Sequence, residues 1–167
     1  MSALTWAVAA VVTDGAGQVL LCRQGRGERR HALPGGRLRP GESPARAVGR
    51  DIRAETGWEV ELVDLVGLYH LAEPAARPAG RGGPLPDVLV HVFRARTRGT
   101  RPHDTPAGGC RLSWHDPAAL PEALTPTTRA ALADALAGRS GVIRDCPPAP
   151  PPPTPRTPSP TTHPAHP

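Results

Sequence analysis

The stretch from Gly36 to Trp58 constrains the fold more than any other part of this chain, because both ends of a helix are marked in it. Ser43 is a favourable N-cap residue, and Pro44 follows at the first helical position. Gly57 supplies the residue type that most readily takes the left-handed conformation at a helix end. The apolar residues between these marks recur at helical spacing: Ala47, Val48 and Ile52. The sequence therefore predicts a helix from Ser43 to Thr56.

Two carboxylates lie on one face of this predicted helix. Asp51 and Glu55 are four residues apart, so their side chains project from the same side. Carboxylate oxygens are the ligands that hard divalent ions prefer. Residue 54 occupies the neighbouring position on that face, and it is an alanine. The spacing therefore allows Asp51 and Glu55 to converge on one ion.

Strands are predicted on both sides of the helix, with a second capped helix near the end of the foldable region. Alanine and valine predominate in the first strand, and Thr125 with Pro126 repeats the cap-then-proline pattern. The segment from Trp58 to Tyr69 fits either two short strands or one bent strand. The predicted elements are strands at 5–13, 18–23, 58–69 and 88–95, a final strand at 111–115, and a helix from 126 to 138. This order, without strict strand–helix alternation, indicates an α+β or mixed-sheet α/β sandwich.

Composition narrows the chemistry and the domain organisation. The 20 basic residues are all arginine, which excludes Schiff-base and P-loop lysines, and the net charge of +5 is too small to indicate nucleic-acid binding by itself. Eleven of the 23 prolines fall in residues 147–167, which we expect to be disordered, leaving residues 1–146 as one domain. The apolar run at residues 3–12 is too short to span a membrane, so we expect a cytoplasmic protein.

The central stretch also follows a known pattern, G-x5-E-x7-R-E-U-x-E-E-x-G-U, in which U is a bulky apolar residue. The matching residues are Gly36, Glu42, Arg50, Ile52, Glu55, Gly57 and Trp58. Asp51 replaces the first glutamate of the pattern, and Ala54 replaces the second. The chain thus resembles the Nudix hydrolases, and the resemblance extends from about Leu4 to Gly138.

This resemblance implies an α/β/α sandwich with a mixed sheet and a role for several residues. Asp51 and Glu55 would hold Mg²⁺ or Mn²⁺, with the Gly35 carbonyl as a further ligand. Arg50 would orient the carboxylates, and Glu42 would be either close to the metal or a structural partner. The resemblance also implies that Arg23 contacts substrate phosphate. The alternative is that Arg23 is a solvated arginine without a role in binding. Tyr69 is one of five aromatic residues and a candidate for stacking on a base, with core packing as the alternative.

Two functions follow from the resemblance, and the sequence leaves both open. The first is metal-dependent hydrolysis of a diphosphate linkage in a nucleoside diphosphate derivative. The second is a catalytically weakened nucleotide-binding or sensor module. This alternative stays open because Asp51 and Ala54 replace two glutamates of the family pattern. In either case the expected partner is a small nucleotide-type molecule rather than nucleic acid or a membrane, and a homodimer is one option for the oligomeric state.

Overall fold

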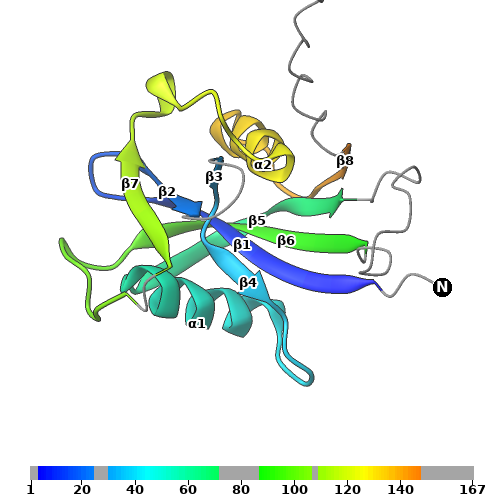
Figure 1. Cartoon of the computed structure of the whole chain (residues 1–167), viewed down its shortest axis with the longest axis horizontal. Coiled ribbons are helices and arrows are strands. Elements are labelled where there is room, and N and C mark those ends of the chain that lie inside the picture. Colours follow the sequence, from blue (N-terminus) through cyan, green and yellow to red (C-terminus); the bar gives the residue numbers. More distant parts are fainter. Residues whose placement is uncertain (1–3, 25–29, 72–86, 107–108, 148–167) are drawn as a thin grey trace, which may run out of the picture.

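A mixed β-sheet lies between two helices in the computed structural model, which describes residues 4–24, 30–71, 87–106 and 109–147 (Figure 1). The helices are α1 (Pro44–Thr56) and α2 (Pro126–Leu136), and a 3₁₀ turn spans Pro117–Ala119. The strands are β1 (Thr5–Thr13), β2 (Val19–Gln24), β3 (His31–Ala32), β4 (Gly35–Arg37), β5 (Val60–Leu71), β6 (Val88–Thr97), β7 (Cys110–His115) and β8 (Val142–Cys146).

The sheet combines parallel and antiparallel neighbours. Its main path runs β3-β2-β1-β6-β5-β8, with β4 paired to β1 and β7 paired to β2. The pairs β1–β6 and β5–β8 are parallel, whereas β5–β6, β1–β4 and β2–β7 are antiparallel. The short β4 therefore lies beside β1, with Gly36 opposite Val8 and Gly35 opposite Ala9.

Each helix covers one face of the sheet and closes one half of the core. The α1 face contains Leu20 of β2 together with Val48 and Ile52 of the helix. The α2 face contains Leu21 of β2 together with Leu132 of the helix. Figure 1 shows α1 (teal) and α2 (yellow) on opposite sides of the strands. The alternation of Leu20 and Leu21 follows from the two-residue period of a strand, and it confirms the predicted α/β/α sandwich.

Most of the predicted elements are confirmed, but the second helix ends at Leu136 rather than at residue 138, and the short strands β3 and β4 have no counterpart among the predicted elements. The first strand and the first helix have the predicted extents, and the segment after the helix forms one strand with register shifts at Leu62/Asp64 and Leu65/Gly67. The strand at 110–115 is not the last, because β8 follows α2 and pairs with β5. The apolar residues of β8 are Val142, Ile143 and Cys146, and they do not alternate with polar residues, so the strand lacks the pattern that predicts one.

The predicted disorder of the proline-rich tail at 147–167 falls outside the described residues, except at Pro147. Among the residues that the structure does describe, no helix is both long enough and apolar enough to cross a membrane.

A buried carboxylate connects α2 to the sheet. The Asp134 side chain is 2 % exposed and accepts hydrogen bonds from the Tyr69 hydroxyl (3.0 Å), from Arg139 (3.0 Å) and from two nitrogens of Arg144 (2.9 and 2.6 Å). Tyr69 belongs to β5 and Arg144 to β8, so one residue joins three elements. Hydrogen bonds from Arg144 hold the pKa of Asp134 well below its usual range, although burial opposes this shift.

We expect Asp134→Ala to lower the free energy of unfolding by about 1–3 kcal/mol, because it leaves the buried Tyr69 hydroxyl without an acceptor. Tyr69→Phe should cost less, about 0.5–1.5 kcal/mol. A carboxyl whose pKa is lower in the folded than in the unfolded protein stabilises the fold at any pH above the pKa of the unfolded chain. The loss of unfolding free energy in Asp134→Ala should therefore shrink as the pH falls below 3.8. Denaturant unfolding measures both effects. Asp145→Ala is the control, since its side chain is 94 % exposed, and an equal loss in that variant would contradict the assignment.

Candidate active site

Helix α1 is fixed at both ends, and this sets the direction of its carboxylates. The Ser43 hydroxyl accepts a hydrogen bond from the Arg46 N–H (3.3 Å). At the other end Gly57 has φ of 75°, and its N–H donates to the Arg53 carbonyl (2.9 Å). With the buried side of the helix packed on the sheet, Asp51 and Glu55 both lie against the short strand β4.

Arg50 links the loop before the helix to the first of these carboxylates. Its guanidinium donates to both oxygens of Glu42, at 2.8 and 2.7 Å, and to Asp51 Oδ1 at 2.5 Å. The paired bonds to Glu42 fix the plane of the guanidinium, which in turn fixes one oxygen of Asp51. Arg50 also holds the pKa of Glu42 below its usual range. The geometry favours an orienting role for Arg50 and a structural role for Glu42.

Asp51 is placed by the absence of a side chain at Gly36. A Cβ at that position would meet Asp51 Oδ2 at 2.5 Å, so the carboxylate lies directly against the glycine backbone. This Oδ2 is buried and accepts no hydrogen bond from the residues that the structure describes. Burial raises the pKa of Asp51 although Arg50 opposes the shift. A buried anionic oxygen without a donor is costly, and a cation would remove that cost.

Glu55 meets the neighbouring glycine of the same strand. The Gly35 N–H donates to Glu55 Oε2 at 2.9 Å, which leaves the other carboxylate oxygen available. Burial raises the pKa of Glu55, the bond from Gly35 opposes this shift, and the charge of Asp51 adds to it. The two carboxylates are four residues apart on α1 and therefore converge on Gly35 and Gly36 from the same side of the helix.

The donor set suits a hard divalent ion. The available atoms are carboxylate oxygens, and one of them is buried without a partner. Mg²⁺ takes one or two protein carboxylates and completes its shell with water and phosphate oxygens. Ala54, on the exposed side of the helix, adds no ligand. The residues present thus fit one ion, which Asp51 and Glu55 could hold next to the Gly35 backbone.

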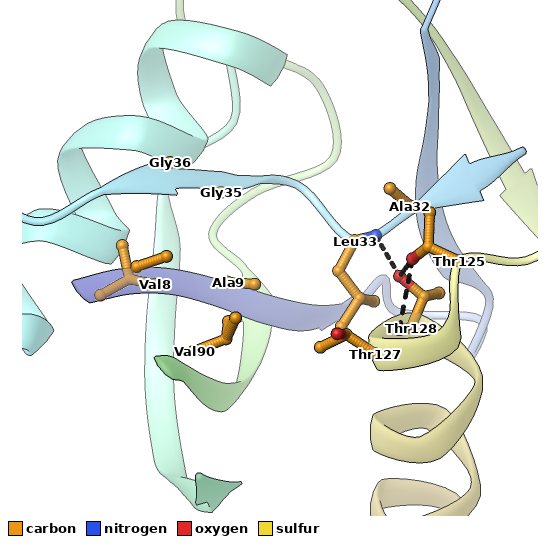
Figure 2. Close-up of a pocket in the computed structure, with 11 residues that line it drawn as sticks. Val8, Ala9, Ala32, Leu33, Gly35, Gly36, Val90, Thr125, Thr127 and Thr128 are labelled. Atoms are coloured by element: carbon orange, nitrogen blue, oxygen red, sulfur yellow. Dashed lines mark hydrogen bonds between the residues drawn. The ribbon is translucent and has the colours of Figure 1, made fainter. Parts of the chain in front are cut away.

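A cavity of about 240 Å³ lies next to the same two glycines. Apolar residues of β1 and β6 line it together with Leu33, and the start of α2 contributes Thr125, Thr127 and Thr128 (Figure 2). The Thr128 hydroxyl accepts a hydrogen bond from the Leu33 N–H at 2.9 Å, which joins α2 to the segment leading into β4. The cavity and the carboxylates therefore share the Gly35–Gly36 backbone.

Two residues predicted to bind substrate do not join the carboxylates. Tyr69 is fully buried in the core under α2, where its hydroxyl donates to Asp134, so it cannot stack on a substrate base in this structure. Arg23 follows Cys22 on β2, and the Cys22 sulfur lies near Glu55. Because successive strand residues face opposite sides, Arg23 points to the face covered by α2. It does not line the cavity.

Comparison with known proteins decides the family. The model of the NUDIX domain matches residues 3–135. The chain belongs to the Nudix family. The MutT Nudix hydrolase structure from Burkholderia pseudomallei is 26% identical, with a TM-score of 0.62 over 79% of this chain and 98% of that one. A Nudix hydrolase from Nitrosomonas europaea is 25% identical, with a TM-score of 0.64 over 83% and 93%.

More distant structures share the Nudix fold alone. An ADP-ribose pyrophosphatase from Streptococcus suis is 16% identical, with a TM-score of 0.58 over 84% of this chain and 98% of that chain. A search of curated proteins found no match to the chain.

The Nudix pattern identified the carboxylates but not their surroundings. Thr127 and Thr128 were not singled out, although Thr125 and Pro126 marked the start of their helix. The approach of Cys22 to Cys110 was also missed, because 88 residues separate them and no local spacing marks the pair. The pairing of β2 with β7 brings the cysteines together, and the packing of α2 beside Leu33 places the threonines.

We expect Gly36→Ala to fold normally but to bind Mn²⁺ about tenfold or more weakly, because its methyl group displaces the movable Asp51 carboxylate. Gly35→Ala is the matched comparison. Its methyl group would strike the β1 backbone at Val8 and Ala9, which cannot move aside, so this variant should lose several degrees of melting temperature. Calorimetric titration and thermal melts separate the two effects. Unchanged Mn²⁺ affinity in a folded Gly36→Ala protein would refute the placement of Asp51.

Proposed function

We propose that this Nudix protein hydrolyses a diphosphate linkage in a nucleoside diphosphate derivative, with Mg²⁺ or Mn²⁺ as the cofactor. The observation that carries the proposal is the convergence of Asp51 and Glu55 on Gly35 and Gly36, with Asp51 Oδ2 buried and unpartnered within the described structure. Membership of the Nudix family supports the same reaction class.

Each residue of the site has a part in this chemistry. Bound there, a divalent ion would offset the charge of the diphosphate oxygens and polarise the reacting phosphoryl group. Asp51 offers its unpartnered oxygen to the ion, and Arg50 keeps that carboxylate in place. Glu55 retains one oxygen on the Gly35 N–H, and its other oxygen would be available either to the ion or to take a proton from the attacking water. In the protein without an ion, burial raises the pKa of Glu55, which favours proton uptake over that of an ordinary glutamate.

The cavity supports a nucleoside as the remainder of the substrate. Its apolar walls suit a flat ring, and the threonine hydroxyls at the start of α2 offer polar contacts for orientation. Of the described strands, β4 pairs with β1 alone, so its other edge provides a route from the cavity to the carboxylates. A diphosphate lying along that edge would pass Gly35 and Gly36. The specific nucleoside derivative is left to a substrate panel.

Ala54 supports a second candidate, a nucleotide-binding module with little or no hydrolytic activity. Its methyl group is exposed at the position where the family pattern has a glutamate. With only two helical carboxylates, a second ion would lack a ligand, and a mechanism that needs several ions would fail. Such a protein would still hold a nucleotide in the cavity.

We expect Glu55→Gln to lower kcat by about 100-fold or more, because it removes one anionic ligand and the candidate base. The fold should persist, since the amide oxygen of glutamine can still accept the Gly35 hydrogen bond. Without metal its melting temperature at pH 7 should equal or exceed that of the native protein, because ionised Glu55 is unfavourably buried. Formation of the two phosphorylated products, separated by chromatography over a substrate panel with Mg²⁺ and Mn²⁺, gives the rates. Glu61→Gln, at an exposed position of β5, is the control, and equal rates in all three proteins would exclude Glu55 from catalysis.

We expect Ala54→Glu to raise the rate, because it restores a third carboxylate beside Asp51 and Glu55. Position 54 is exposed and adjacent on the helix to Arg50 and Arg53, so the added charge should be tolerated. If only Ala54→Glu hydrolyses diphosphates, the binding-module function is correct for the native chain. If neither form hydrolyses any diphosphate and both bind nucleotide without metal, the proposal of an enzyme fails.

A further inference from the structure

A second group of potential metal ligands lies at the edge of the carboxylate site. Cys22 of β2, Cys110 of β7 and Glu55 of α1 each offer one ligand atom, and these atoms lie within 4.8 Å of one another. Cys22 is 2 % exposed, and the other two residues are partly buried. Each residue belongs to a regular element, so the fold holds the three ligand atoms together without a flexible loop.

Strand register explains why the two cysteines meet. Cys22 is opposite Leu112, and Cys110 is opposite Gln24, so the cysteines form a diagonal pair with Cα atoms 5.7 Å apart. The structure pairs them as a disulfide on the sheet face that α1 covers. The closeness that permits this bond would also place two free thiols beside the Glu55 carboxylate after reduction.

We propose that the reduced protein binds one Zn²⁺ ion through Cys22, Cys110 and Glu55. Two sulfurs and a carboxylate oxygen are typical zinc ligands, and a fourth position would remain for water. Mg²⁺ does not compete well for such a site, because it prefers oxygen ligands in an octahedral arrangement. The disulfide and the zinc site exclude one another, since both sulfurs must be thiolates to bind the ion.

The two metal sites would share Glu55. A glutamate held by zinc is withdrawn from the site at Asp51, so zinc should inhibit diphosphate hydrolysis by the reduced protein. This consequence rests on the proposed function, whereas zinc binding itself does not. The primary test therefore measures binding and requires no substrate.

The full-length protein is first reduced with a water-soluble phosphine. The phosphine takes up the oxygen of one water molecule and becomes its oxide, and the disulfide becomes two thiols. After the phosphine is removed under argon, Zn²⁺ affinity is measured by competition with a chromogenic chelator. We expect tight binding of one equivalent of zinc by the reduced native protein and binding at least about 100-fold weaker by the oxidised protein, in which only the carboxylates remain as ligands. Both thiols should lose their protons on binding.

Three variants make the test specific. Cys110→Ser should weaken zinc binding at least about 100-fold. Losing a residue that only hydrogen-bonds a metal ligand already costs up to about 100-fold in affinity, and Cys110 would bind the ion directly. Glu55→Gln should weaken it about tenfold or more. Cys146→Ser is the matched control, because Cys146 is a buried free cysteine in the α2 half of the core and should leave the affinity unchanged.

A spectroscopic measurement covers the case in which a variant folds poorly. Co²⁺ in place of Zn²⁺ on the reduced native protein should give a thiolate-to-cobalt charge-transfer absorption, which disappears on oxidation of the pair. The inference is overturned if the reduced native protein binds no zinc, if Cys110→Ser binds it as tightly, or if the cobalt band is absent. Loss of binding in Cys146→Ser alone would assign the zinc to a different cysteine and would also overturn it.

Discussion

The candidate site depends on the close approach of α1 to Gly35 and Gly36, two consecutive residues of β4 that lack side chains. At Gly36 a Cβ would meet the Asp51 carboxylate, and at Gly35 it would meet the backbone of β1. The two glycines let β4 fit between β1 and the helix, so that Asp51 lies on one residue and Glu55 accepts a hydrogen bond from the other. Asp51 could not reach this position over a side chain at residue 36, and a side chain at residue 35 would push β4 away from β1. The two glycines and the register of β4 therefore determine where an ion can bind.

The ion pairs beside β4 leave Glu42 fully paired and Asp51 only half paired. Arg50 satisfies both oxygens of Glu42 and one of Asp51, which stabilises the loop before α1 and the base of the site. The other oxygen of Asp51 stays buried without a donor, and burial raises the pKa of both Asp51 and Glu55. On the opposite face of the sheet, both oxygens of Asp134 accept hydrogen bonds from protein side chains, and the pKa of this carboxyl is lowered rather than raised. Fully satisfied carboxylates support the fold, and incompletely satisfied ones are candidates for chemistry.

The features that depend on residues close together in the sequence, namely the ends of α1 and its carboxylate face, were predicted correctly. Ser43, Pro44 and Gly57 gave the correct ends of α1, because capping depends on residues a few positions apart. The spacing of Asp51 and Glu55 correctly predicted a shared helix face. Tyr69 was misplaced as a substrate contact because its partner, Asp134, lies 65 residues away. The strand β8 and the Cys22–Cys110 pair were likewise set by long-range pairing, which no short window of sequence contains.

The central claim is that Asp51 and Glu55 bind one divalent ion beside Gly35. The most direct test is an anomalous difference map from crystals of the full-length protein grown with Mn²⁺ and a non-hydrolysable diphosphate analogue. The account predicts a manganese peak in contact with both carboxylates, with phosphate oxygens and water completing its coordination. A map with the analogue bound and no manganese at Asp51 and Glu55, or with manganese held only by other residues, would contradict it.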